Sequence, residues 1–121
     1  MVEQIYKLTQ ENKKTIEKII MDENIHYMHM ILNKGECLPE HVSNAQGVYM
    51  TVVRGRLSAK LGEQETHEYP AGTVLKIPFQ TKMNICNKDD DTLELIVVKA
   101  PAPLTDSKNI KWLKESIYYG K

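Results

Sequence analysis

Hydrophobic and polar residues alternate in short runs through the middle of this chain, and turn-forming residues separate the runs. In the segment RLSAKLG, for example, Leu57, Ala59 and Leu61 alternate with polar residues. Successive side chains of a β-strand point to opposite faces, so this alternation predicts a strand with one buried face. Several short strands separated by turns predict an antiparallel sandwich or barrel.

Further strands are predicted where β-branched, aromatic and methionine residues gather between turn signals. These segments are IHYMHMIL (25–32), GVYMTVV (47–53), THEYPAGTVLKIP (66–78), KMNICN (82–87) and TLELIVVKA (92–100). A Pro-Ala-Gly turn divides the third segment into two strand candidates. The prolines after the last segment end it, because proline cannot donate a hydrogen bond to a sheet ladder.

The pattern between residues 11 and 24 leaves two structures open. Ile16, Ile19 and Ile20 fit the apolar stripe of a helix. The run is also short enough to be a strand that enters the sheet.

The last residues, 107–121, have the pattern of an amphipathic helix. Ile110, Leu113 and Ile117 share one face at helical spacing, and Gly120 suits the C-terminal end of a helix. We therefore expect three parts along the chain: an N-terminal extension (1–24), a barrel (25–100), and a proline-rich break with a C-terminal helix (101–121).

The composition is that of an ordinary globular chain with one domain. Its 121 residues, 41% of them hydrophobic, suffice for one core but not for two. Lys and Arg together number 16, as do Asp and Glu, so the formal net charge is zero. Such a chain creates no broad positive electrostatic field that would attract phosphate backbones or anionic lipid. We therefore expect neither a nucleic-acid nor a membrane partner.

The two cysteines, Cys37 and Cys86, do not make a disulfide framework, and their spacing does not suggest a zinc site. The first residues are polar, unlike the apolar core of a signal peptide. The sequence therefore predicts a protein of the reducing cytoplasm. His26 and His29, three residues apart in a predicted strand, should lie on opposite faces and not share a metal.

The spacing of glycines and a histidine resembles the first motif of the cupin superfamily. In that motif a glycine is followed, after five residues, by His-x-His, then by a glutamate and, six residues later, by a second glycine. Here ECLPE separates Gly35 from His41, and YMTVVR leads to Gly55. A second cupin motif contains Pro-x-Gly, a proline, a histidine and an asparagine.

The second motif also has counterparts in this chain: Pro70, Ala71 and Gly72 open it, and Pro78 and Asn87 follow. The resemblance covers residues 27–100. It implies an all-β fold, the cupin double-stranded β-helix, which is a jelly-roll-like barrel, here followed by a C-terminal helix.

The resemblance also identifies the positions at which metal-binding cupins carry three histidines and a glutamate. Of these four positions, only that of His41 holds the metal-binding residue of the motif. Ser43 stands at the second histidine, Val48 at the glutamate and Met83 at the histidine of the second motif. Valine has no donor atom, and neutral serine and methionine are poor ligands for divalent ions, so we expect no metal and no other cofactor.

The same four residues, His41, Ser43, Val48 and Met83, are the predicted ligand-binding site. We expect the motif to aim His41 into the barrel, beside a largely apolar cavity that holds a small organic ligand without a metal. His41 is alternatively a structural residue bonded to the backbone or to Ser43. Catalytic residues are not identified.

Two other function classes stay open. The chain is alternatively a cupin enzyme, either a metal-independent sugar-type epimerase or isomerase with His41 as general base, or a metal-dependent enzyme with atypical ligands. It is alternatively a dimeric scaffold without a ligand. A homodimer is expected in any case, because sheet edges need cover and the tail carries Trp112, Tyr118 and Tyr119.

Overall fold

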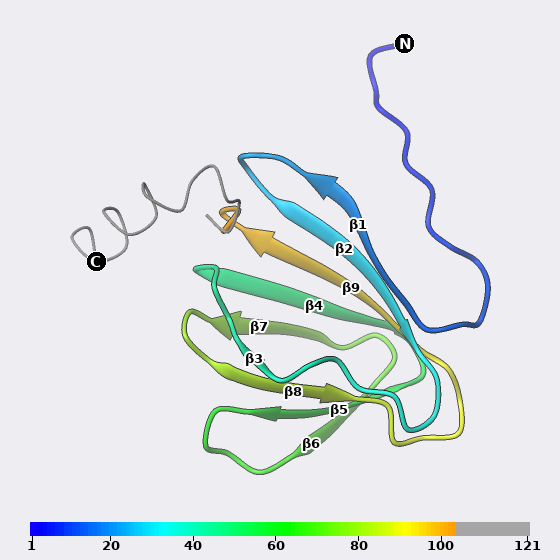
Figure 1. Cartoon of the computed structure of the whole chain (residues 1–121), viewed down its shortest axis with the longest axis vertical. Coiled ribbons are helices and arrows are strands. Elements are labelled where there is room, and N and C mark those ends of the chain that lie inside the picture. Colours follow the sequence, from blue (N-terminus) through cyan, green and yellow to red (C-terminus); the bar gives the residue numbers. More distant parts are fainter. Residues whose placement is uncertain (104–121) are drawn as a thin grey trace.

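The computed structural model describes residues 1–103, which form two antiparallel β-sheets (Figure 1). Within these residues the chain forms nine strands: β1 (Thr15–Met21), β2 (His26–Leu32), β3 (His41–Val42), β4 (Gly47–Arg54), β5 (Arg56–Leu61), β6 (His67–Pro70), β7 (Val74–Pro78), β8 (Lys82–Cys86) and β9 (Leu93–Ala100). The all-β prediction is confirmed for this part of the chain, and the predicted C-terminal helix lies outside the described residues. The described residues include no helix long and apolar enough to cross a membrane.

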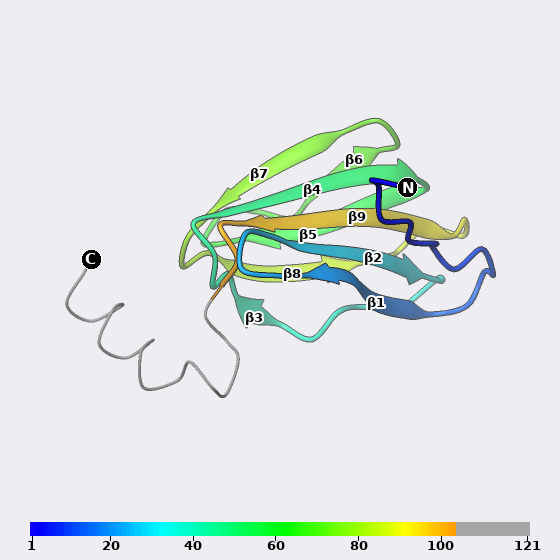
Figure 2. The same ribbon diagram turned by 90° about the horizontal axis from the view of Figure 1, so that it is seen from above.

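The two sheets draw on strands far apart in sequence. The larger has the order β1-β2-β9-β4-β7, and the smaller the order β3-β8-β5-β6. Figure 2 shows the larger sheet as consecutive strands from β7 to β1. Because β4, β7 and β9 belong to one sheet and β5, β6 and β8 to the other, the chain passes back and forth between the sheets and encloses a barrel.

The core forms where the alternating apolar residues of both sheets meet. On β9, Leu93, Leu95 and Val97 are buried, while the residues between them are half-buried. Leu57 and Ala59 of β5 are fully buried from the opposite sheet and belong to the same core cluster. Apolar side chains from both sheets thus exclude water from the space between them.

The segment for which the sequence allowed either a helix or a strand forms strand β1, at one edge of the larger sheet. It pairs with β2 alone in the described part of the chain, and a bulge interrupts the register between Lys18 and Ile20. The first residues of the chain extend away from the barrel (Figure 1), and Val2 and Ile5 are 100% and 63% exposed.

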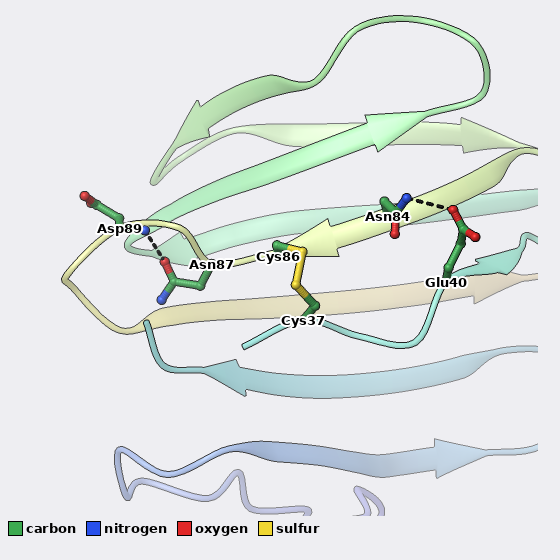
Figure 3. The surroundings of a disulfide bond; sticks show 6 residues. All are labelled: Cys37, Glu40, Asn84, Cys86, Asn87 and Asp89. Atoms are coloured by element: carbon green, nitrogen blue, oxygen red, sulfur yellow. Dashed lines mark hydrogen bonds between the residues drawn. A yellow bond between two sulfur atoms is a disulfide. The ribbon is translucent and has the colours of Figure 1, made fainter. Parts of the chain in front are cut away.

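Contrary to the sequence-based expectation, Cys37 and Cys86 form a disulfide with an S–S distance of 2.06 Å (Figure 3). The bond joins the loop after β2 to the last residue of β8, where the two cysteines also form an isolated β-bridge. Sequence reasoning missed the bond because the cysteines are 49 residues apart and only the folded chain brings them together.

Asn87, the last residue of the second motif, is a structural residue beside this disulfide. It is fully buried, its Nδ2 donates to the carbonyl oxygens of Leu32 and Asp91, and its Oδ1 accepts from the backbone N–H of Asp89 (Figure 3). These bonds tie the β8–β9 turn to the end of β2. Asn87 therefore closes one end of the barrel and does not face the cavity described below.

The two glycines of the first motif are required for different structural reasons. A pair of alanine variants can distinguish these reasons. Gly35 and Gly55 have φ angles of +81° and +83°, values that L-residues rarely adopt. A Cβ at Gly35 would meet nothing within 4 Å, whereas one at Gly55 would lie 2.3 Å from the carbonyl oxygen of Thr92.

We expect Gly35→Ala to lower the free energy of unfolding by about 1–2 kcal/mol, through backbone strain alone. Gly55→Ala should cost about 1–3 kcal/mol more, because the methyl group overlaps backbone that must move. Urea unfolding of both variants and the wild type checks this order. Equal costs for the two variants would contradict it.

Candidate ligand-binding site

A cavity of about 160 Å³ lies between the two sheets. Most of its wall is apolar, and the polar residues in the wall are His41, Ser43 and Lys99. The described residues that line it are Ile16, Met28, Met30, Leu38, Pro39, His41, Ser43, Val48, Met50, Met83, Val97 and Lys99. An apolar cavity of about 150 Å³ holds a benzene molecule, so the size suits a small organic ligand.

The four residues predicted for the site all line this cavity. Val48 of β4 and Met83 of β8 are 1% and 3% exposed and form opposite walls, one from each sheet. His41 of β3 pairs in register with Met83 of β8, which places it at the same end of the barrel. The spacing of the motifs therefore predicted which residues come together.

His41 lies at the mouth of the cavity and not inside the barrel as expected. Strand β3 is two residues long and both are exposed. The Nδ1 atom of His41 lies 2.9 Å from the carbonyl oxygen of Pro39. Because a carbonyl only accepts, Nδ1 donates this bond, and Nε2 is the acceptor atom of the neutral ring. The predicted backbone bond is present, and the ring turns toward the rim.

Ser43 is buried and its hydroxyl is already bonded. Its Oγ donates to the carbonyl oxygen of Pro78 at 2.6 Å and accepts from the backbone N–H of Thr81 at 2.8 Å. The hydroxyl therefore holds the β7–β8 turn in place. It has no second proton to donate, so toward a ligand its Oγ can act only as an acceptor.

The donor set at this position does not fit a metal centre. Val48 offers no donor, Met83 offers only a thioether, and the Ser43 hydroxyl is held by backbone groups. Within residues 1–103 no three His, Cys, Asp or Glu side chains gather as a metal site. A single histidine at an open mouth does not provide the three or four ligands that such ions need.

Lys99 lines the cavity and was missed in the sequence. It continues the inward positions of β9 after Leu93, Leu95 and Val97, so the alternation itself was the signal that could have found it. Its Nζ donates to Oδ1 of Asn44 at 3.3 Å. Burial, and then the charge of Lys18, lower the pKa of Lys99.

His26 lies beside Lys99 near this mouth. It pairs with Lys99 across strands β2 and β9. Burial lowers the pKa of His26, and the charges of Lys99 and Lys18 lower it further, while Asp22 acts in the opposite direction. The positively charged groups at this end of the larger sheet at neutral pH are therefore those of Lys99 and Lys18.

His29 lies on the opposite face of β2, as predicted, inside a second polar cluster. It is fully buried, with Nδ1 2.7 Å from Oε2 of Glu17 and Nε2 2.5 Å from Oε2 of Glu94. Arg54 Nε donates to Oε1 of Glu94 at 2.9 Å. Carboxylates only accept, so both contacts of His29 are hydrogen bonds when both ring nitrogens carry a proton.

This cluster shifts the pKa values of both glutamates. The hydroxyl and the backbone N–H of Thr9, and then His29, lower the pKa of Glu17 to about 2. For Glu94, burial raises the pKa, but the hydrogen bonds and charges of His29 and Arg54 outweigh it and the net shift is downward. The cluster lies on the outer face of the larger sheet, away from the cavity.

Comparison with known proteins identifies the family. No protein family model matches the chain. An uncharacterised protein of Methanocaldococcus jannaschii is 38% identical over 104 residues, which are 85% of this chain and 89% of that protein. Its crystal structure is described as an RmlC-like cupin family protein with a double-stranded β-helix fold. The chain belongs to the cupin family.

The fold comparison agrees with this assignment. The M. jannaschii cupin has a TM-score of 0.82 at 36% identity, over 85% of this chain and 94% of that one. A cupin superfamily protein of Desulfitobacterium hafniense has a TM-score of 0.66 at 12% identity, over 78% and 83%, which shows the fold alone. The expected cupin double-stranded β-helix is confirmed. The M. jannaschii relative is uncharacterised, so it names no ligand for this cupin.

The Glu17 contacts predict how the stability of this cupin depends on pH. The folded-state pKa of Glu17, about 2, lies below the value of 4.5 for a free glutamate. Its ionised form therefore stabilises the fold above pH 4.5, and this contribution falls as the pH drops toward 2.

We expect Glu17→Gln to lower the free energy of unfolding at neutral pH, with a difference from the wild type that shrinks below pH 4.5. Urea unfolding at a series of pH values measures this difference. The exposed Glu65→Gln on the β5–β6 turn is the control, with a small difference at every pH. A Glu17→Gln difference that stays constant down to low pH would contradict the assignment.

Proposed function

We propose that this cupin binds a small organic ligand in the cavity between its sheets, without a metal. The observation that carries the proposal is the composition of the cavity, whose apolar walls come from both sheets while His41 and Lys99 lie at its mouth. Apolar walls with a few placed polar groups are typical of small-molecule sites. Burial of the ligand's apolar part supplies affinity, and the polar groups orient it.

An isomerase or epimerase is the second candidate. The Nδ1 donation of His41 to Pro39 makes Nε2 the proton acceptor of the neutral ring, as a general base requires. The other ionisable side chain among the described lining residues is Lys99, which would have to serve as the acid. Turnover of a bound compound that His41→Ala abolishes would favour this candidate.

The binding proposal is tested on protein treated with EDTA, so that any ligand found binds without a metal. A thermal-shift screen of small aromatic compounds, carboxylates and sugars is followed by calorimetry of the hits. We expect Val48→Phe, which fills the cavity, to remove binding. His41→Ala should weaken it by about 0.5–1.5 kcal/mol, the scale of one hydrogen bond at an exposed rim.

The matched control is His67→Ala, since His67 is exposed on β6 and is not among the described lining residues. It should bind the same compounds with unchanged affinity. No hit with the wild type, or hits that Val48→Phe still binds, would contradict the proposal. A blank screen would instead favour a scaffold that has no ligand.

We also propose that the protein forms a homodimer. Edge strand β1 exposes Ile16 and Met21 at 46% and 44%, and the extended N-terminal residues expose Val2 and Ile5. An arm with exposed apolar side chains and an open sheet edge on one chain complement their counterparts on a second copy.

Light scattering of the full chain should therefore give twice the chain mass at high micromolar concentration. Removal of residues 1–8 should shift the protein toward the monomer, because it removes the exposed arm. The control Val74→Ser changes an exposed residue of the opposite edge strand, β7, and should leave the dimer intact. A monomeric full chain would contradict the proposal.

The expected cytoplasmic location stays a prediction. One reason for this expectation was the lack of a disulfide framework. The Cys37–Cys86 disulfide removes that reason, because such bonds are rare in a reducing cytoplasm.

A further inference from the structure

The cavity has two chemically different ends. Its interior is formed by aliphatic and methionine side chains, of which Met30, Val48 and Met50 are 6% exposed or less. Its mouth carries the ammonium group of Lys99 and the ring of His41. A ligand that fills both ends has an apolar body and a polar or charged head.

The charged groups around the mouth are unbalanced. Lys99 lies beside His26 in register, and the charge of Lys18 reaches both. Among the described lining residues none is acidic. Asp22 is a carboxylate near His26, and its Oδ1 already accepts from the backbone N–H groups of Asn24 and Ile25.

Glu40, the residue before His41, is also engaged elsewhere. It accepts from Nδ2 of Asn84 at 2.7 Å and lies 3.7 Å from Nζ of Lys82. Lys99 is half-buried, and the one partner described for it is the neutral amide of Asn44. A partly buried ammonium without a carboxylate partner favours an anion that enters the same space.

We propose that the ligand is a small monocarboxylic acid whose apolar body fills the cavity and whose carboxylate pairs with Lys99. The inference rests on the proposed function, because it names the class of ligand for the same cavity. A volume of about 160 Å³ suits a body the size of one benzene ring. One ammonium group balances the single charge of a carboxylate better than a phosphate, which carries a charge of about −1.5 to −2.

Three compounds that share one phenyl ring and differ in the charge of the head group test the charge preference: benzoate, benzyl alcohol and benzylamine. Their binding to the EDTA-treated full chain is measured by calorimetry at neutral pH and low salt. We expect benzoate to bind about tenfold or more tightly than benzyl alcohol, and benzylamine to bind more weakly than either.

Two variants of Lys99 assign the preference to this residue. Lys99→Met replaces the apolar stem of the lysine with one of similar size and removes the charge, so it should keep benzyl alcohol binding and lose the preference for benzoate. Lys99→Arg should restore the preference, because it restores the charge. The control Lys76→Met removes an exposed lysine on β7, whose Nζ lies 5.8 Å from the Tyr49 ring centroid, and should behave as the wild type.

The outcomes distinguish a failure of the carboxylate inference from a failure of the proposed function. Equal affinities of the wild type for benzoate and benzyl alcohol would overturn the carboxylate inference and leave the cavity as a binding site. A benzoate preference that survives in Lys99→Met would overturn it too, because the carboxylate would then lie elsewhere. Binding of none of the three compounds, nor of any other in the screen, would overturn the proposed function itself.

Discussion

The hydrogen-bonded position of β9 between β2 and β4 is the constraint on which the rest of the structure depends. Because β9 is paired on both sides, its register fixes which residues point inward along its whole length. Leu95 and Val97 enter the core, and Lys99 reaches the mouth of the cavity. Glu94, on the other face, meets His29 and Arg54. One alternating strand thus supplies the core, the mouth and the outer cluster.

Much of the framework could be predicted from the sequence because it depends on local patterns. Alternation identified the strands, and Gly55 was recognised at a position where the backbone requires it. The side chains that motif spacing placed together, including Val48 and Met83, do line one cavity. These features follow from the two-residue period of strands and from conformations that few residues adopt.

Other features depend on contacts that no local pattern contains. The Cys37–Cys86 bond needs two distant segments to meet, and the direction of the His41 ring depends on a carbonyl two residues earlier. A bulge after Val52 brings Arg54 opposite Glu94 on the outer face, whereas uninterrupted alternation would have pointed it inward. Register shifts of one residue reverse a side chain, so simple periodicity fails at such points.

The loss of metal ligands and the character of the cavity have the same origin. Val48 and Met83 stand where the resemblance expects donors, and each removes a polar atom while it adds apolar wall. A dry apolar wall lowers the local dielectric constant, so a charge at its edge interacts more strongly with an ion of opposite sign than it would in water. Apolar residues at the positions where the resemblance expects metal ligands therefore increase the influence of the Lys99 charge at the mouth. In the proposed site, the polar groups that orient a ligand are therefore those at the rim, Lys99 and His41.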